Sequence, residues 1–184
     1  MKKKAKKKIY KYLYFSIALI CLLFGIYKYI NNYLNKDSLL KGPYYVTHVI
    51  DGDTIMTNID SKSIKIRIIG IDTPESAASE DSDKVNTHEG EIATARAKQL
   101  LENKHIYIEY DKEKYDKYGR MLAYVYFDDK KTMYEDIILS EGLAISLQIE
   151  PNIKYQKQFE SIQNKAKDNK TGFWETGFYE WTHH

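Results

Sequence analysis

The feature that most constrains the fold is a short stretch in which apolar and charged residues alternate. Ile64, Ile66 and Ile68 alternate with Lys65 and Arg67. A period of two residues is typical of a β-strand with one buried face and one exposed face. Comparable runs of strand-forming residues predict further strands at residues 43–50, 54–58, 106–110 and 121–127.

Apolar residues recur at helical spacing between and after these strands. Segment 88–103 places Ala93, Ala97, Leu100 and Leu101 on one face, and further helices are predicted at 133–141 and 154–167. Three strands, a helix, two strands and then helices predict a mainly β fold, a small antiparallel barrel with about three helices packed on it.

The N-terminus has the pattern of a targeting segment. Residues 1–11 include seven lysines, and residues 12–30 are predominantly apolar, with a charge-free run of 16 residues from Tyr12 to Tyr27. Because this run is shorter than the roughly 20 residues of a usual spanning helix, a span needs Lys11 and Lys28 to extend outward. We expect a hydrophobic helix that serves as an uncleaved membrane anchor, with a cleaved signal peptide as the alternative. Lysines on the near side predict a cytoplasmic N-terminus and an exported domain, which would be secreted if the segment is cleaved.

Charge is distributed unevenly along the chain. Nine lysines and no acidic residue precede Asp37, so the remainder has 19 basic and 26 acidic residues and a net charge of −7. A sequence-independent DNA-binding protein normally presents a broad basic surface. If this chain acts on nucleic acid, we expect a local site in which a metal ion and a few arginines outweigh the acidic background. Cys21 is the only cysteine, which excludes internal disulfides and thiolate metal sites.

These observations predict five parts of the chain. They are a basic cytoplasmic N-terminus at 1–11, the anchor or signal segment at 12–30, a polar linker at 31–42, a folded domain at 43–175 and a C-terminal tail at 176–184. Within the domain, the Ser- and Asp-rich stretch 76–87 is predicted to be a mobile loop.

Three short segments concentrate residues that can carry chemistry. They are 49–55 (VIDGDTI), 67–75 (RIIGIDTPE) and 116–124 (DKYGRMLAY). Taken singly, each is consistent with an ordinary turn, a helix cap or a hairpin. Together they offer carboxylates at strand ends, which suit Ca²⁺ or Mg²⁺, and two arginines that can neutralise a phosphate. Phosphodiester cleavage needs an activated water and positive charge where the phosphorus centre becomes more negative.

All three segments resemble the signature motifs of the thermonuclease (staphylococcal nuclease-like) family, in the same order and with similar spacing. The resemblance extends over residues 43–174 and includes Glu141–Ala144. It implies a five-stranded OB-fold barrel with three helices and a Ca²⁺-dependent endonuclease that acts on DNA, RNA or both and leaves 3′-phosphate ends.

The resemblance also implies a role for individual residues. Asp53, Asp72 and the backbone carbonyl of Thr73 would hold one Ca²⁺ ion, and Asp51 would support this site from behind. Glu75 would activate or orient the attacking water. Arg67 and Arg120 would hold the phosphate and stabilise the transition state, while Lys117 and Tyr118 would contact a neighbouring phosphate.

Two departures from the family pattern concern the substrate. The loop that is often Lys-rich in the family contains Glu80, Asp81 and Asp83 here. After Ala144, where the family commonly has a Tyr that stacks on a base, this chain continues with Ile145-Ser146-Leu147-Gln148-Ile149. Both changes predict weaker substrate binding with an unchanged catalytic set.

Two other classes of function compete with a nuclease. The first is a catalytically weak or inactive nuclease-like barrel that binds nucleic acid or protein at the cell surface, and the second is a purely structural surface domain. The full set of carboxylates and arginines favours the enzyme, because neither alternative needs it. We expect a monomer, held at the membrane by the N-terminal helix, and assign no role to the five histidines.

Overall fold

The computed structural model describes residues 14–30, 39–76 and 87–181, which fall into two compact units that divide after Leu39. Residues 14–30 of the first unit form a helix. Among the described residues, no helix combines the length and the hydropathy that crossing a bilayer requires. Residues 12, 13 and 77–86, on which parts of the predicted anchor and loop fall, lie outside the described residues.

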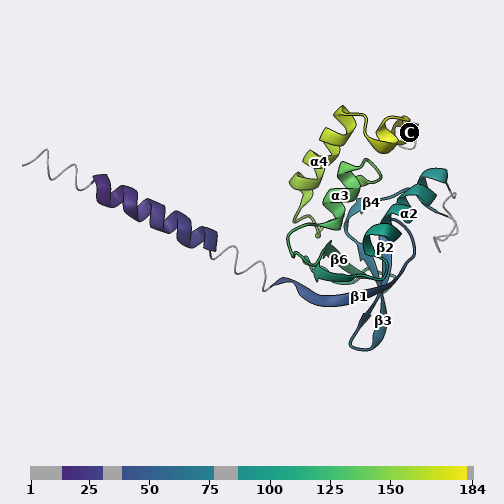
Figure 1. Cartoon of the computed structure of the whole chain (residues 1–184), viewed down its shortest axis with the longest axis horizontal. Helices are drawn as coiled ribbons and strands as arrows, with labels where there is room; N and C mark the ends of the chain where they lie inside the picture. The colour runs from purple at the N-terminus through teal and green to yellow at the C-terminus, as the bar shows by residue number, and fades with distance from the viewer. Residues whose placement is uncertain (1–13, 31–38, 77–86, 182–184) are drawn as a thin grey trace, which may run out of the picture. The chain divides into compact units, whose positions relative to one another are not determined.

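The second unit is built on the predicted five-stranded barrel (Figure 1). The strands are β1 (Lys41–Val49), β2 (Thr54–Ile59), β3 (Lys62–Ile68), β5 (His105–Glu109) and β6 (Met121–Tyr126). They close in the order β1-β2-β3-β6-β5. Isoleucines at alternating positions fill the interior, and Ile55, Ile66, Ile68, Ile106 and Ile108 are all fully buried. This confirms the fold class inferred from the period-two pattern.

One strand pair differs from the antiparallel barrel that the sequence predicted. β3 and β6 run parallel, with Ile66 opposite Met121 and Ile68 opposite Ala123. A parallel pair needs a long crossover, and the connection from β3 to β6 contains β4 (Gly70–Asp72), helix α2 (His88–Leu101) and strand β5. Because the alternation of side chains is the same in both strand directions, the sequence pattern could not reveal this.

A second, two-stranded sheet was not predicted. β4 pairs antiparallel with β7 (Ile145–Leu147), so that Asp72 lies opposite Ile145. Three residues are too few for a recognisable period. This sheet has a direct bearing on the site, since it fixes the strand end that presents Asp72.

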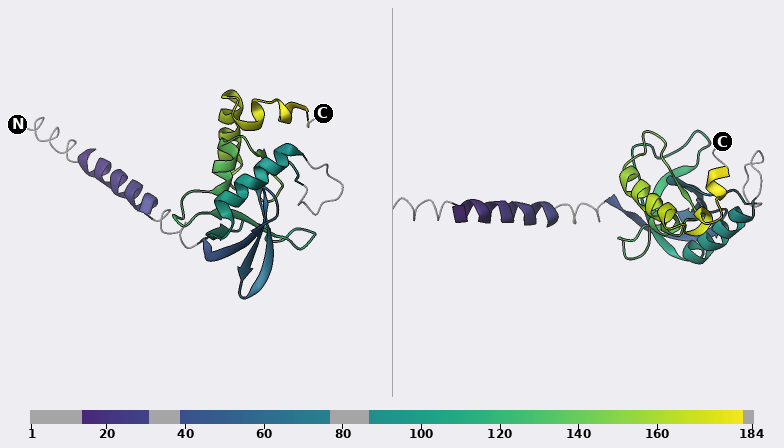
Figure 2. Two further views of the ribbon diagram at one scale, coloured as in Figure 1. Left: turned by 45° about the vertical axis from the view of Figure 1, so that its right-hand side comes forward. Right: turned by 90° about the horizontal axis from the view of Figure 1, so that it is seen from above.

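The helices agree with the predicted ones to within two residues at each end, which is the usual uncertainty of helix boundaries. They are α2 (His88–Leu101), α3 (Tyr134–Ser140) and α4 (Gln156–Asp168), followed by a 3-10 turn (Gly172–Trp174) and α5 (Phe178–Trp181). Figures 1 and 2 show α3 and α4 packed together on one side of the barrel, with the C-terminal segment beyond them.

Two predicted boundaries differ from the structure. β1 begins at Lys41 and Leu40 is buried in the core, although both residues fall in the predicted linker. At the other end, helix α5 lies within the predicted tail, and its Tyr179 packs against Ala93 and Phe173. The folded unit is therefore wider than residues 43–175, because aromatic residues near the C-terminus form a small apolar cluster with the buried Ala93 of α2.

Candidate active site

The turn between β1 and β2 is held from three sides. The Asp53 amide donates to Asp51 Oδ1 at 3.0 Å, and the Tyr134 hydroxyl donates to the Gly52 carbonyl at 2.6 Å. A Cβ atom at Gly52 would lie 2.6 Å from Thr73 Oγ1, so only glycine allows this close approach. Asp51 and Asp53 are both buried. The turn is therefore a rigid support for two carboxylates.

Thr73 joins this turn to the end of β4. Its backbone amide and its hydroxyl both donate to Asp53 Oδ2, at 3.0 and 3.1 Å. Thr54 donates to the other oxygen, Asp53 Oδ1, at 3.1 Å. Two residues that are 20 positions apart are thus locked together, and the Asp53 carboxylate is held in one orientation.

Arg67 connects the two carboxylates predicted to bind metal. Its Nη1 lies 3.0 Å from Asp53 Oδ1, and its Nη2 lies 2.9 Å from Asp72 Oδ1. Nη1 also donates to the carbonyls of Ile68 and Ile71, at 2.7 and 3.0 Å. Only 14% of the Arg67 side chain is exposed. Its position is therefore set by the backbone of the same strand-to-strand bend that presents Asp72.

Negative charge accumulates around the turn. Burial, followed by the charge of Asp53 and then that of Glu75, raises the pKa of Asp51 from 3.8 to about 7, against the opposing effects of the Asp53 amide and Arg67. The group of carboxylates therefore favours additional positive charge. Hard carboxylate oxygens in this setting fit a divalent cation such as Ca²⁺ or Mg²⁺.

Within the described residues, no group of three or more His, Cys, Asp or Glu side chains is arranged as a metal site. The predicted set uses fewer, namely two carboxylates and the Thr73 carbonyl. Asp53 and Asp72 are brought together by Arg67, and Thr73 contacts Asp53 directly. The residues that could hold a cation are therefore adjacent, and water or substrate oxygens would complete the coordination.

Arg120 is oriented by its own loop. Asp116 Oδ2 accepts from Arg120 Nε at 2.6 Å, and Asp116 Oδ1 accepts from the amides of Tyr118 and Arg120 at 2.9 and 2.8 Å. Burial alone would raise the pKa of Asp116, but these hydrogen bonds with Arg120 and Tyr118 outweigh it and lower the pKa. Asp116 thus stays ionised and fixes the guanidinium through Nε, and no hydrogen bond or ion pair within the described residues uses the two terminal nitrogens.

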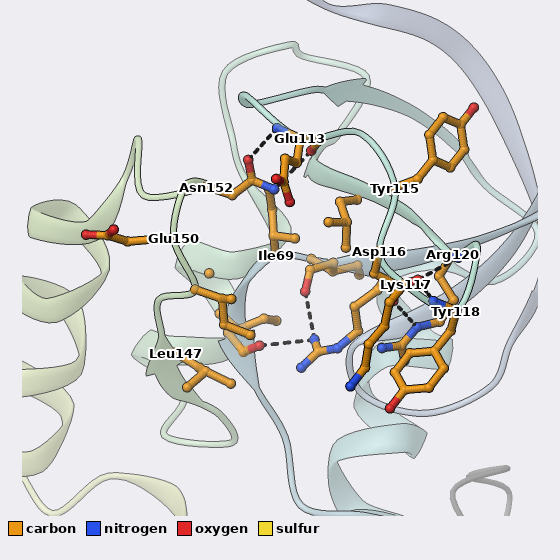
Figure 3. A pocket seen from close by; sticks show the side chains of 16 residues that line it. Ile69, Glu113, Tyr115, Asp116, Lys117, Tyr118, Arg120, Leu147, Glu150 and Asn152 are labelled. Carbon is orange, nitrogen blue, oxygen red and sulfur yellow. Dashed lines mark hydrogen bonds and ion pairs between the residues drawn. The ribbon is translucent and has the colours of Figure 1, made fainter.

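A cavity of about 460 Å³ brings the predicted phosphate contacts together. Figure 3 shows Lys117, Tyr118 and Arg120 on one side of it and Leu147 and Glu150 on the other. Arg67 also lines the cavity, and through it the cavity adjoins Asp53 and Asp72. Tyr118 is 73% exposed, and the Lys117 ammonium lies 4.9 Å from the centre of its ring.

Glu75 follows β4 and is half-buried. Its carbonyl accepts from the Thr87 amide at 3.0 Å, at the start of α2. Only Pro74 separates it from Thr73, which bonds to Asp53 in the turn. The structure therefore brings all nine predicted site residues to one region: Asp51, Asp53, Arg67, Asp72, Thr73, Glu75, Lys117, Tyr118 and Arg120.

Sequence reasoning missed several supporting residues. Asp116 could have been found, because it precedes Arg120 by four residues in the same motif. Tyr134 could not, because it lies 82 residues from Gly52 and carries no local signal. The side chain of Thr73 was missed too, since only its carbonyl had been assigned a role.

Fold and site together define the class of the protein. It is an OB-type β-barrel in which two arginines lie beside buried carboxylates. The model of the staphylococcal nuclease homologue family matches residues 65–176, and the chain belongs to this family. It is 40% identical over 134 residues to a thermonuclease of Staphylococcus hyicus, covering 71% of this chain and 75% of that protein. It is 36% identical over 167 residues to a thermonuclease of Staphylococcus intermedius, covering 87% and 93%. It is also 39% identical over 132 residues to endonuclease YncB of Bacillus subtilis strain 168, covering 71% and 60%.

Proposed function

We propose that the protein is a Ca²⁺-dependent nuclease that hydrolyses phosphodiester bonds of DNA, RNA or both and leaves 3′-phosphate ends. The observation that carries this proposal is the position of Arg67. It lines the same cavity as Arg120 and bonds to Asp53 and Asp72. A phosphate held by the two arginines is thereby placed next to the carboxylates that suit a cation. The names of the thermonuclease and endonuclease relatives support the same activity.

The two arginines have separate tasks in the proposed reaction. Arg120 offers its terminal nitrogens to the phosphate from the side of the β5–β6 loop. The contacts of Arg67 within the described residues use Nη1 and Nη2, which leaves its Nε–H for a phosphate oxygen. Donors that are fixed before the reaction stabilise the negative charge that develops as water attacks.

Glu75 accepts the proton of the attacking water as the water oxygen bonds to phosphorus. The bond from phosphorus to the 5′ oxygen breaks, and that oxygen takes a proton from solvent and leaves as a 5′-hydroxyl. Glu75 lies beyond the end of β4, and Asp53, Asp72 and the Thr73 carbonyl would hold the cation beside it. When bound, Ca²⁺ supplies positive charge next to the phosphate. Lys117 contacts a neighbouring phosphate and orients the strand in the cavity.

Digestion of plasmid DNA and of RNA by the full chain tests the proposal. We expect cleavage with Ca²⁺, none with excess EDTA, and 3′-phosphate ends in the products. Because the predicted ligands leave positions for water and substrate, the cation should bind weakly in the absence of substrate. Full activity in chelator would exclude the metal assignment. Binding of oligonucleotides without cleavage, in protein free of degradation, would instead favour the inactive binding barrel.

A further inference from the structure

The start of α2 holds the backbone of Glu75 in a fixed position. The Thr87 amide donates to the Glu75 carbonyl at 3.0 Å, and the Thr87 hydroxyl donates to the same oxygen at 3.2 Å. That hydroxyl also accepts from the Gly90 amide at 3.0 Å, as the N-cap of the helix. Thr87 therefore links the helix terminus to the Glu75 carbonyl by a continuous chain of hydrogen bonds.

Gly90 lies directly against this carbonyl. A Cβ atom at position 90 would lie 1.8 Å from the Glu75 oxygen, 2.2 Å from its carbonyl carbon and 2.8 Å from the Ser76 nitrogen. All three are backbone atoms, so no side-chain rotation could relieve the overlap. Gly90 is buried and its φ is that of an ordinary helix residue. Alanine would be the better helix former at such a position, so the close approach, and not the backbone conformation, accounts for the glycine.

We propose that Gly90 and Thr87 are positioning residues for Glu75, which set the place of its carboxylate by fixing its main chain from the start of α2. This inference rests on the proposed function, in which Glu75 accepts a proton from the attacking water. Glu75 follows β4 after Thr73 and Pro74, and Thr73 in turn bonds to Asp53 in the turn between β1 and β2. The contacts with α2 supply a second anchor on the other side. Small displacements of a catalytic group from its working position can cost as much as about 10²-fold in rate.

The test compares Gly90→Ala, Thr87→Val and Thr87→Ser in the full chain. Val retains the shape of Thr but loses the hydroxyl, whereas Ser retains both hydrogen bonds. In single-turnover cleavage at saturating Ca²⁺ and substrate, we expect Gly90→Ala to be slower by about 10-fold or more and Thr87→Val to be slower by a smaller factor. Thr87→Ser should match the wild type. Ala95→Ser, an exposed change on the same helix, is the matched control and should leave the rate unchanged.

A double-mutant cycle with Glu75→Gln separates positioning from general damage. If Gly90 acts through Glu75, then Gly90→Ala should slow the Glu75→Gln variant hardly at all. An equal loss in both backgrounds would overturn the inference. If Gly90→Ala does not fold, the same cycle with Thr87→Val tests whether the start of α2 acts through Glu75.

A readout that does not depend on activity keeps this inference distinct from the proposed function. In protein with ¹³C-labelled glutamate carboxyls, the Glu75 resonance is identified by its loss in Glu75→Gln. It should shift in Gly90→Ala and Thr87→Val and stay in place in Thr87→Ser and Ala95→Ser. An unmoved resonance in both test variants would refute the proposal that Gly90 and Thr87 position Glu75. A wild-type chain that cuts no nucleic acid would refute the proposed nuclease function. The resonance would still show whether Gly90 and Thr87 position Glu75.

Discussion

At the residue scale, the candidate site contains two arginines that are held in different ways. Arg67 is fixed by two backbone carbonyls and two carboxylates, whereas the ion pair of Arg120 within the described residues is with Asp116. A lysine at either position would keep the charge but lose the planar fork that makes two parallel bonds. Charge alone therefore cannot reproduce either contact.

Arg67→Lys and Arg120→Lys should each slow single-turnover cleavage by about 10²-fold or more, comparable to the loss of an oxyanion donor. Arg96→Lys is the matched control, because Arg96 pairs with Glu141 and does not line the cavity. Its rate should stay close to that of the wild type. Wild-type rates in both test variants would make the binding barrel the better description.

Asp72 and Glu75 should respond differently to Ca²⁺. Asp72→Asn removes the charge of a predicted ligand whose side chain is 29% exposed, so we expect weaker Ca²⁺ binding and a rate that higher Ca²⁺ partly restores. Glu75→Gln should slow cleavage strongly and leave Ca²⁺ affinity nearly unchanged. The measurement is Ca²⁺ titration by calorimetry alongside single-turnover rates. Equal losses of Ca²⁺ affinity in both variants would show that Glu75 is itself a ligand.

At the element scale, polar groups inside the fold tie the helices to the barrel. Glu109 at the end of β5 accepts from the hydroxyls of Tyr126 and Tyr155, at 3.0 and 2.7 Å, and pairs with Lys154 just before α4. Glu135 in α3 accepts from the Val125 amide of β6 at 3.0 Å. The helices are thus fixed by specific acceptors as well as by apolar packing.

Glu135 gives this fold a predictable dependence on pH. The side chain is fully buried, and burial raises its pKa well above 4.5. The folded state therefore keeps a proton that the unfolded state releases above about pH 4.5, so this group makes the folded state less stable as pH rises toward the folded pKa. Glu135→Gln keeps an acceptor for Val125 and removes the titration.

We expect Glu135→Gln to be more stable than the wild type at pH 8, with a smaller or reversed difference at pH 4. Urea unfolding at both pH values measures this. Glu175→Gln, an exposed change, should follow the wild type. A wild-type advantage that persists at pH 8 would mean that the ionised carboxylate is satisfied inside the fold.

At the scale of the whole molecule, charge limits how nucleic acid can be held. Outside the lysine-rich N-terminus, the chain carries 19 basic and 26 acidic residues. Each phosphate contact adds about 0.9 to the slope of log affinity against log salt on duplex DNA. We expect a shallow slope, measured by fluorescence anisotropy on the Glu75→Gln variant, in which cleavage is suppressed. A slope that corresponds to about six or more contacts would show that the acidic surface does not limit binding.

Location at a membrane stays a prediction from the N-terminal lysines and the apolar run that follows them. Protease added to intact cells should remove the nuclease domain while the N-terminus stays protected, as detected by tags at the two ends. Cells opened by detergent are the control and should lose both tags. A shortened soluble form found only in the medium would instead indicate a cleaved signal segment.

Local patterns by themselves predicted the barrel strands and the three longer helices, and the resemblance of three ordered motifs to a known family indicated nine candidate site residues. Side-chain alternation in β3 and the order of the three motifs depend on neighbours in the chain, so they can be read without coordinates. The parallel β3–β6 pair, the β4–β7 sheet, Tyr134 on Gly52 and Gly90 on Glu75 were decided by the tertiary structure alone. Each joins segments separated by 15 to 82 residues along the chain. Such contacts form only when the core packs closely and brings distant segments together. A close fit between distant backbones produces no periodic pattern in the sequence.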